Sequence, residues 1–169
     1  PGAPAAIKLE PEQISITAGE SQQISFHIYD AYENLIPDAD YAWIIEKNLG
    51  IVSTQNVFTA RSAGIGHINL AVGEVSAKIG VAVVPGDIDT VMVEPAMITL
   101  KAGDQQAFSA AGFDAQGNRL NIEPVWSVNG DIGKIGADGV FQSTTVGRGY
   151  VLVRMDSATG VAEITVEPG

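Results

Sequence analysis

The polar residues that recur at a fixed spacing are the first candidates for chemistry in this chain. Asp30 and Asn34 bound one short segment, and Asp114 and Asn118 bound a second segment of the same length. An aspartate carboxylate can accept hydrogen bonds from backbone N–H groups about two residues on, so each segment is predicted to be a tight turn. The alternative is a calcium site, because oxygen-rich loops suit this hard cation.

Asp87, Asp89 and Asp114 are the residues that could supply such a calcium site. Asp87 and Asp89 lie where the two halves of the chain meet, and a cation bound there could stiffen the junction. Calcium takes roughly six to eight oxygen ligands, however, and the sequence has no run of the form D-x-D-x-D. We therefore expect neither a metal ion nor any other cofactor, and keep these three carboxylates as the residues to test.

Tyr29, Tyr32 and Tyr41 are the candidate ligand-binding residues, because they lie close together in the first half of the chain. The second half has an aromatic residue at only one of the corresponding positions, where Phe113 matches Tyr29. If only the first half binds a ligand, these tyrosines could form its binding site, because they occur only in that half. The alternative is ordinary packing of loop side chains.

The two histidines, His27 and His67, are the first residues to consider for catalysis. Both are out of phase with the apolar residues of their strands, so both are predicted to face solvent. The chain has no G-x-S-x-G elbow, no phosphate-binding Walker loop and no H-E-x-x-H metal motif. We therefore expect no catalytic site and no enzyme activity in this chain.

These residues belong to a tandem repeat. A shift of 84 positions aligns Glu10 with Glu94 and Asp30 with Asp114, and beyond Ile36 the shift becomes 83. The repeat predicts two domains, residues 1–86 and 87–169. A Pro-Gly pair stands at residues 1–2, 85–86 and 168–169, so the chain is expected to be a piece of a longer polypeptide. It has no basic segment followed by an apolar one at its start, so no signal peptide is expected.

Each repeat consists of short alternating runs separated by turn residues, which is typical of a β-sandwich or barrel. Residues 105–113 alternate with Phe108 and Ala110 on one face, and no stretch shows a sustained helical period. Trp43 recurs as Trp126 within an apolar strand, so both are predicted to lie in the core. The alternative is that they form a platform on which a sugar stacks. Phe58 and Phe141 also recur in register and are interpreted in the same way.

The composition excludes several classes of protein. The 9 basic and 20 acidic residues give a formal net charge of −11, which disfavours binding to nucleic acid. No apolar run approaches the roughly 20 residues that span a bilayer, so no membrane insertion is expected. The absence of cysteine excludes disulfides and Cys-ligated zinc. Even acidity of this kind favours a monomer.

Several sequence motifs carry a resemblance to a known family. The second repeat contains VEPAMITLKAGDQQAFSA, FDAQGN, VWSV, GVF, VGRGYVLV and EITVEPG, and the first contains LEPEQISITAGESQQISF, YDAYEN, AWII, NVF and AGIGHINLAV. Each repeat resembles the bacterial immunoglobulin-like (Ig-like) domains, closest to group 2, of intimin- and invasin-type adhesins, S-layer proteins and accessory modules of secreted enzymes. The first repeat departs from the pattern at Glu33, which replaces the turn glycine, and at Ile44, which replaces serine.

The resemblance implies an all-β fold of two tandem Ig-like antiparallel β-sandwiches arranged end to end. It also implies non-catalytic spacer modules of a larger secreted or cell-surface bacterial protein, whose partners are the neighbouring domains of the same polypeptide. Two alternatives stay open. One is an adhesin-type or carbohydrate-binding module that binds a cell-surface polysaccharide or a host receptor. The other is an accessory domain that packs on a polysaccharide-active enzyme.

Overall fold

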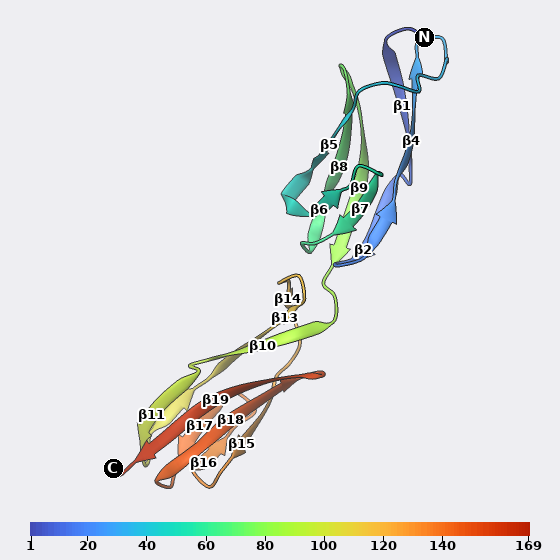
Figure 1. Cartoon of the computed structure of the whole chain (residues 1–169). Coiled ribbons are helices and arrows are strands. Elements are labelled where there is room, and N and C mark those ends of the chain that lie inside the picture. Colours follow the sequence, from blue (N-terminus) through green and yellow to red (C-terminus); the bar gives the residue numbers. More distant parts are fainter. The chain divides into compact units, whose positions relative to one another are not determined.

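β-strands form most of the chain, and the only helical segment is the single turn η1 (Glu46–Asn48). The computed structural model describes all residues from Pro1 to Gly169 (Figure 1). Its contacts divide the chain into two compact units, Pro1–Gly86 and Asp87–Gly169, here called unit 1 and unit 2. None of its helical structure is long and apolar enough to cross a membrane.

Unit 1 contains nine strands arranged in three hydrogen-bonded groups. Their bounds are β1 (Pro4–Glu10), β2 (Gln13–Thr17), β3 (Ser21–Gln23), β4 (Ser25–Asp30), β5 (Ala42–Ile45), β6 (Gly50–Val52), β7 (Val57–Ala60), β8 (Gly64–Val72) and β9 (Val75–Val84). The main sheet has the order β2-β9-β8-β5, and the other groups are β1-β4 and β3-β7-β6. The long β8–β9 hairpin supplies the centre of the main sheet.

Unit 2 repeats this arrangement with one additional short strand. Its strands are β10 (Ile88–Glu94), β11 (Met97–Lys101), β12 (Gln105–Ala107), β13 (Ser109–Asp114), β14 (Arg119–Leu120), β15 (Val125–Asn129), β16 (Gly133–Ile135), β17 (Val140–Ser143), β18 (Gly147–Met155) and β19 (Ala158–Glu167). Their orders are β11-β19-β18-β15, β10-β13-β14 and β12-β17-β16. The same topology in both units confirms the all-β sandwich fold that the repeat predicts.

One pair of strands in each unit is parallel, within an otherwise antiparallel fold. β2 pairs with β9 in parallel, and β11 pairs with β19 in the same way. A proline precedes each of these first partners, Pro11 in unit 1 and Pro95 in unit 2. Because proline lacks the N–H that a sheet needs, it ends the preceding strand. The chain then continues in the opposite sheet, beside the last strand of the unit.

Each unit has its own hydrophobic core. Phe58 and Phe141 are fully buried, as predicted, and they lie at equivalent positions of the two units. Trp43 and Trp126 pack against the two cores and are themselves only half-buried. The alternation of β18 also holds, because Val151, Val153 and Met155 are buried while their neighbours are less so.

Two glycines let the backbone approach these phenylalanines closely. A Cβ on Gly50 would collide with the backbone oxygen of Thr59 and with the ring of Phe58. A Cβ on Gly133 would collide in the same manner with the oxygen of Gln142 and with the ring of Phe141. Glycine is therefore required at both positions by the packing.

Candidate functional site

The Asp30–Asn34 turn is held by the aspartate side chain. Asp30 Oδ1 accepts hydrogen bonds from the backbone N–H groups of Tyr32 and Asn34, each 2.9 Å long. The Asn34 side chain donates to the same carboxylate, at 3.0 Å from Oδ2. Unit 2 has the same arrangement, in which Asp114 Oδ1 accepts from the N–H groups of Gln116 and Asn118 at 2.9 and 2.8 Å. Both carboxylates thus act as the internal acceptors of a tight turn.

Asp30 has a further donor from the start of the chain. The backbone N–H of Gly2 donates to Asp30 Oδ2 at 2.8 Å. This hydrogen bond, followed by those from the side chain and backbone of Asn34, holds the pKa of Asp30 well below its ordinary range. The carboxylate is therefore charged at neutral pH, the form that accepts these hydrogen bonds.

The candidate calcium ligands lie in different surroundings. Asp87 and Asp89 are exposed at the start of unit 2, on either side of Ile88, the residue that pairs with Asp114. Asp114 is buried, and its two carboxylate oxygens accept the N–H donors of its own turn. No group of three or more His, Asp or Glu side chains is placed to hold a metal ion. Any calcium ion at Asp114 would have to compete with those donors.

The three candidate tyrosines lie on different elements of unit 1. Tyr32 lies at the tip of the Asp30–Asn34 turn and is 85% exposed. Tyr29 lies on β4 and its ring is 6.4 Å from that of His27. Tyr41 precedes β5, where it packs edge-on against Phe26 with 4.7 Å between the ring centroids. No ring contact joins Tyr41 to either of the other two tyrosines.

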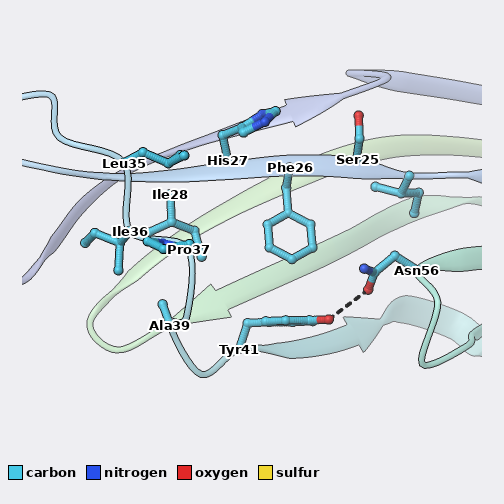
Figure 2. A pocket seen from close by; sticks show the side chains of 11 residues that line it. Ser25, Phe26, His27, Ile28, Leu35, Ile36, Pro37, Ala39, Tyr41 and Asn56 are labelled. Atoms are coloured by element: carbon cyan, nitrogen blue, oxygen red, sulfur yellow. Dashed lines mark hydrogen bonds between the residues drawn. The ribbon is translucent and has the colours of Figure 1, made fainter. Parts of the chain in front are cut away.

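Tyr41 lines a groove that we call the β4 groove. The groove has a volume of about 510 Å³ and runs along β4 and the segment that leads to β5. It is lined by Ile24, Ser25, Phe26, His27, Ile28, Leu35, Ile36, Pro37, Ala39, Tyr41 and Asn56. Figure 2 shows Phe26 pointing from β4 toward Tyr41, while Ser25 and His27 point to the opposite side of the strand.

Asn56 holds the aromatic wall of the β4 groove in place. Its Oδ1 accepts hydrogen bonds from the hydroxyl of Tyr41 and from the indole N–H of Trp43, both 3.1 Å long. The Tyr41 bond is the dashed line in Figure 2. Asn56 has a φ of 62°, a left-handed conformation that asparagine tolerates better than most residues. The wall therefore has a fixed polar anchor behind an apolar surface.

Unit 2 lacks the side chains that form this groove. The repeat places Ala110 at the position of Phe26 and Pro124 at that of Tyr41. Gly139 occupies the position of Asn56 and also has a positive φ, of 80°. The backbone conformation is therefore the same in both units, but unit 2 lacks the amide side chain that accepts the hydrogen bonds. The sequence reasoning identified Tyr41 but missed Phe26 and Asn56. A signal was present, because both residues differ between the repeats next to a matching one, Ser25 with Ser109 and Val57 with Val140.

The two histidines have structural surroundings. His27 is exposed on β4, as predicted. His67 Nδ1 lies 3.3 Å from Glu46 Oε2, which also accepts the backbone N–H of His67 at 2.9 Å. The hydrogen bond from the His67 side chain lowers the pKa of Glu46. This contact joins η1 to β8.

Comparisons with known proteins identify the fold. No protein-family model matches the chain, and no curated protein matches it. The structure of the Escherichia coli adhesin FdeC is similar to 99% of this chain, with a TM-score of 0.54 and 16% identity. Domains 1–6 of the S-layer protein SbsC are similar over 99% of this chain, with a TM-score of 0.51 and 14% identity.

This chain spans 66% of the FdeC chain and 28% of the SbsC chain. At such low identity the likeness concerns the fold alone. The chain consists of two tandem Ig-like β-sandwiches, and this fold also occurs in S-layer and adhesin proteins.

Proposed function

We propose that units 1 and 2 are non-catalytic structural modules of a larger secreted or cell-surface bacterial protein, and that they belong to the group 2 bacterial Ig-like type. The observation that carries this proposal is the likeness of 99% of the chain to an S-layer protein and to an adhesin. Both are proteins of the bacterial surface by description. The partners of the two units are then the neighbouring domains of the same polypeptide.

The side chains of both units support a structural role. The most regularly repeated polar groups, Asp30 and Asp114, are engaged in holding turns. The histidines occupy an exposed strand position and a contact between η1 and β8. The features shared by both units therefore support the fold of each sandwich, and a spacer requires only a stable fold.

The proposal is tested by exchange within the parent protein. The pair is deleted in one strain, and in another it is replaced by two unrelated Ig-like domains of the same length. An antibody against the recombinant pair first determines whether the pair is accessible on intact cells. A spacer predicts antibody signal on the cells or in the culture medium, loss of the parent's activity on deletion, and retention of that activity after exchange. Loss of activity in the exchanged strain would contradict the spacer role, and absence of signal from both cells and medium would contradict the location.

A second candidate function is ligand binding by unit 1, as in an adhesin-type or carbohydrate-binding module. The observation that favours it is the β4 groove, which is lined by Tyr41 and has no counterpart side chains in unit 2. Tyr41→Ala in the parent protein should then abolish binding to its surface receptor or polysaccharide. Tyr32→Ala is the matched control, because this exposed side chain lies outside the groove. Equal activity of both variants would contradict a binding role.

A further inference from the structure

The edge of β4 that borders the groove has unused backbone hydrogen-bonding groups. β4 pairs on one side with β1 only. On the groove side, the N–H of Ile24 donates to Asn56 O at 2.9 Å, and the C=O of Ile28 accepts from Ile36 N at 2.8 Å. Backbone groups along a strand alternate in direction with a period of two residues. Phe26, midway between these two residues, therefore directs its own N–H and C=O toward the groove.

The chain covers only one end of this edge. Leu35 forms an isolated antiparallel bridge with Tyr29, so the chain begins to add a strand beside β4. Proline follows at position 37, and the chain turns away toward β5. The N–H and C=O of Phe26 and the N–H of Ile28 are left without a partner from the chain. The free N–H and C=O of Phe26 match one hydrogen-bonded residue pair of an antiparallel ladder. The free N–H of Ile28 is the next donor along the same edge of β4.

The groove beside this edge is apolar where a strand's side chains would enter it. Phe26 is only half-buried although it points between the sheets, and Tyr41 is 40% exposed. Because side chains of a strand alternate between its faces, every second residue of an added strand would lie against these two rings. The apolar lining and the free backbone groups thus both match an extended peptide. A sugar has no donors and acceptors spaced at the two-residue repeat of a β-strand.

The charge around the groove limits the kind of peptide. Asp38 and Asp40 are exposed and alternate in sequence with the lining residues Pro37, Ala39 and Tyr41. Neither carboxylate has a salt bridge, and unit 1 as a whole carries 4 basic and 9 acidic residues. An occupant with basic side chains on its outward face would meet this negative rim.

We propose that the β4 groove binds an extended segment of another protein, in which apolar residues alternate with lysine or arginine. The segment adds to β4 as an antiparallel strand, in line with Leu35 and Ile36, and its backbone bonds to Phe26 and Ile28. Its apolar side chains pack in the groove against the exposed faces of Phe26 and Tyr41. Addition of a peptide strand to an exposed sheet edge is a known mode of recognition, in which backbone bonds give affinity and side-chain pockets give specificity. This site does not depend on the spacer role.

The direct test follows the backbone amides of the whole 169-residue chain by nuclear magnetic resonance. The probe is the acetylated and amidated peptide Lys-Val-Lys-Val-Lys at millimolar concentration. We expect shifts at Phe26, Ile28 and Tyr41, and about tenfold slower hydrogen exchange of the Phe26 and Ile28 amides at saturation. The corresponding residues of unit 2, Ala110 and Gly112, serve as an internal control and should not respond.

Three comparisons separate strand addition from other binding. A peptide with N-methylated valines has the same side chains and fewer backbone donors, and it should bind at least about tenfold more weakly. The double variant Asp38→Asn, Asp40→Asn should weaken binding and reduce its salt dependence. Phe26→Ala introduces the residue that unit 2 has at this position and should abolish the response, whereas Tyr32→Ala should not.

The outcomes that overturn the proposal are distinct. The absence of any response on β4, or equal binding of the N-methylated peptide, excludes strand addition. A response to a soluble glucan oligosaccharide in place of the peptide identifies a carbohydrate site at Tyr41. Shifts of equal size in both units indicate non-specific attraction of a cation to an acidic protein. Retained peptide binding by Phe26→Ala would exclude the groove.

Discussion

The carboxylate of Asp30 accepts a hydrogen bond of 2.8 Å from the backbone N–H of Gly2, which lies 28 residues earlier in the chain. The same carboxylate holds its own turn through Tyr32 and Asn34. One side chain therefore fastens both the beginning of unit 1 and the loop after β4. This makes Asp30 a position where a local change should affect a whole end of the unit.

Acid should weaken unit 1 through Asp30. The donors around the carboxylate, led by the Gly2 N–H, lower its pKa in the folded state from the ordinary value of 3.8. A group whose pKa is lowered on folding contributes stability above its unfolded pKa, and that contribution is lost as the pH falls toward its folded pKa. The melting temperature of unit 1 should therefore fall steadily below about pH 4. Circular dichroism melts would measure this, and Asp30→Asn should show a smaller fall; an identical fall would exclude Asp30 as a cause.

Removal of the corresponding carboxylate in unit 2 should destabilise that unit. Asp114→Ala removes the hydrogen bonds from the N–H groups of exposed Gln116 and half-buried Asn118. The loss of each such bond costs about 0.5–1.5 kcal/mol, which is a noticeable part of the stability of so small a unit. Urea unfolding followed by Trp126 fluorescence in a Trp43→Phe background would report on unit 2 alone. An unchanged midpoint would show that water replaces the carboxylate at no cost.

Gly50→Ala and Gly133→Ala should each destabilise their own unit. The new Cβ would collide with the backbone oxygen of Thr59 or Gln142 and with the phenylalanine ring beside it. Overpacking of this kind costs about 1–3 kcal/mol or more. Gly80→Ala is the matched control on β9, since its Cβ would meet only Gln13 Cγ at 3.8 Å. Denaturant titrations of the three variants should leave only Gly80→Ala within about 0.5 kcal/mol of the parent chain.

The tyrosines at positions 41 and 32 should differ in their effect on stability. Tyr41→Ala removes ring contacts with Phe26 and Trp43 and the hydrogen bond to Asn56, so a loss of about 1–3 kcal/mol is expected. Tyr32→Ala removes a side chain that is 85% exposed, so the change should lie within about 0.5 kcal/mol. Thermal melts of the two variants provide the comparison. A larger loss from Tyr32→Ala would mean that the turn depends on that ring.

Calcium should have little effect on the melting temperature of the chain. Asp114 already gives its carboxylate oxygens to N–H donors, and Asp87 and Asp89 are exposed without further acidic residues in a cluster. Melts in calcium chloride and in EDTA should therefore coincide. A rise of several degrees with calcium, abolished by Asp87→Asn and Asp89→Asn, would instead establish a structural cation site.

The sequence alone predicts the strands, the core and the turns of each unit, but it does not predict the β4 groove. The period-two pattern and the repeat identify the strands, the buried Phe58 and Phe141, and the Asp30–Asn34 turn, because these depend on local or repeated signals. The three tyrosines illustrate the limit. Tyr29 lies on β4, Tyr32 in the turn after it and Tyr41 in the segment before β5, and proximity in sequence does not reveal which rings each of them contacts. Tyr41 contacts Phe26, which lies on β4 in a sheet to which Tyr41 does not belong, and only tertiary packing reveals this contact.

The parallel contact between β2 and β9 also determines how unit 1 carries a mechanical load. A pull on the two ends of the unit draws β2 and β9 past each other along their own axes. The hydrogen bonds from Gln13 to Thr17 then bear the force together instead of opening one after another. The pair β11 and β19 gives unit 2 the same geometry. In a surface protein exposed to flow, both units would resist extension in shear, the direction in which a strand pair is hardest to separate.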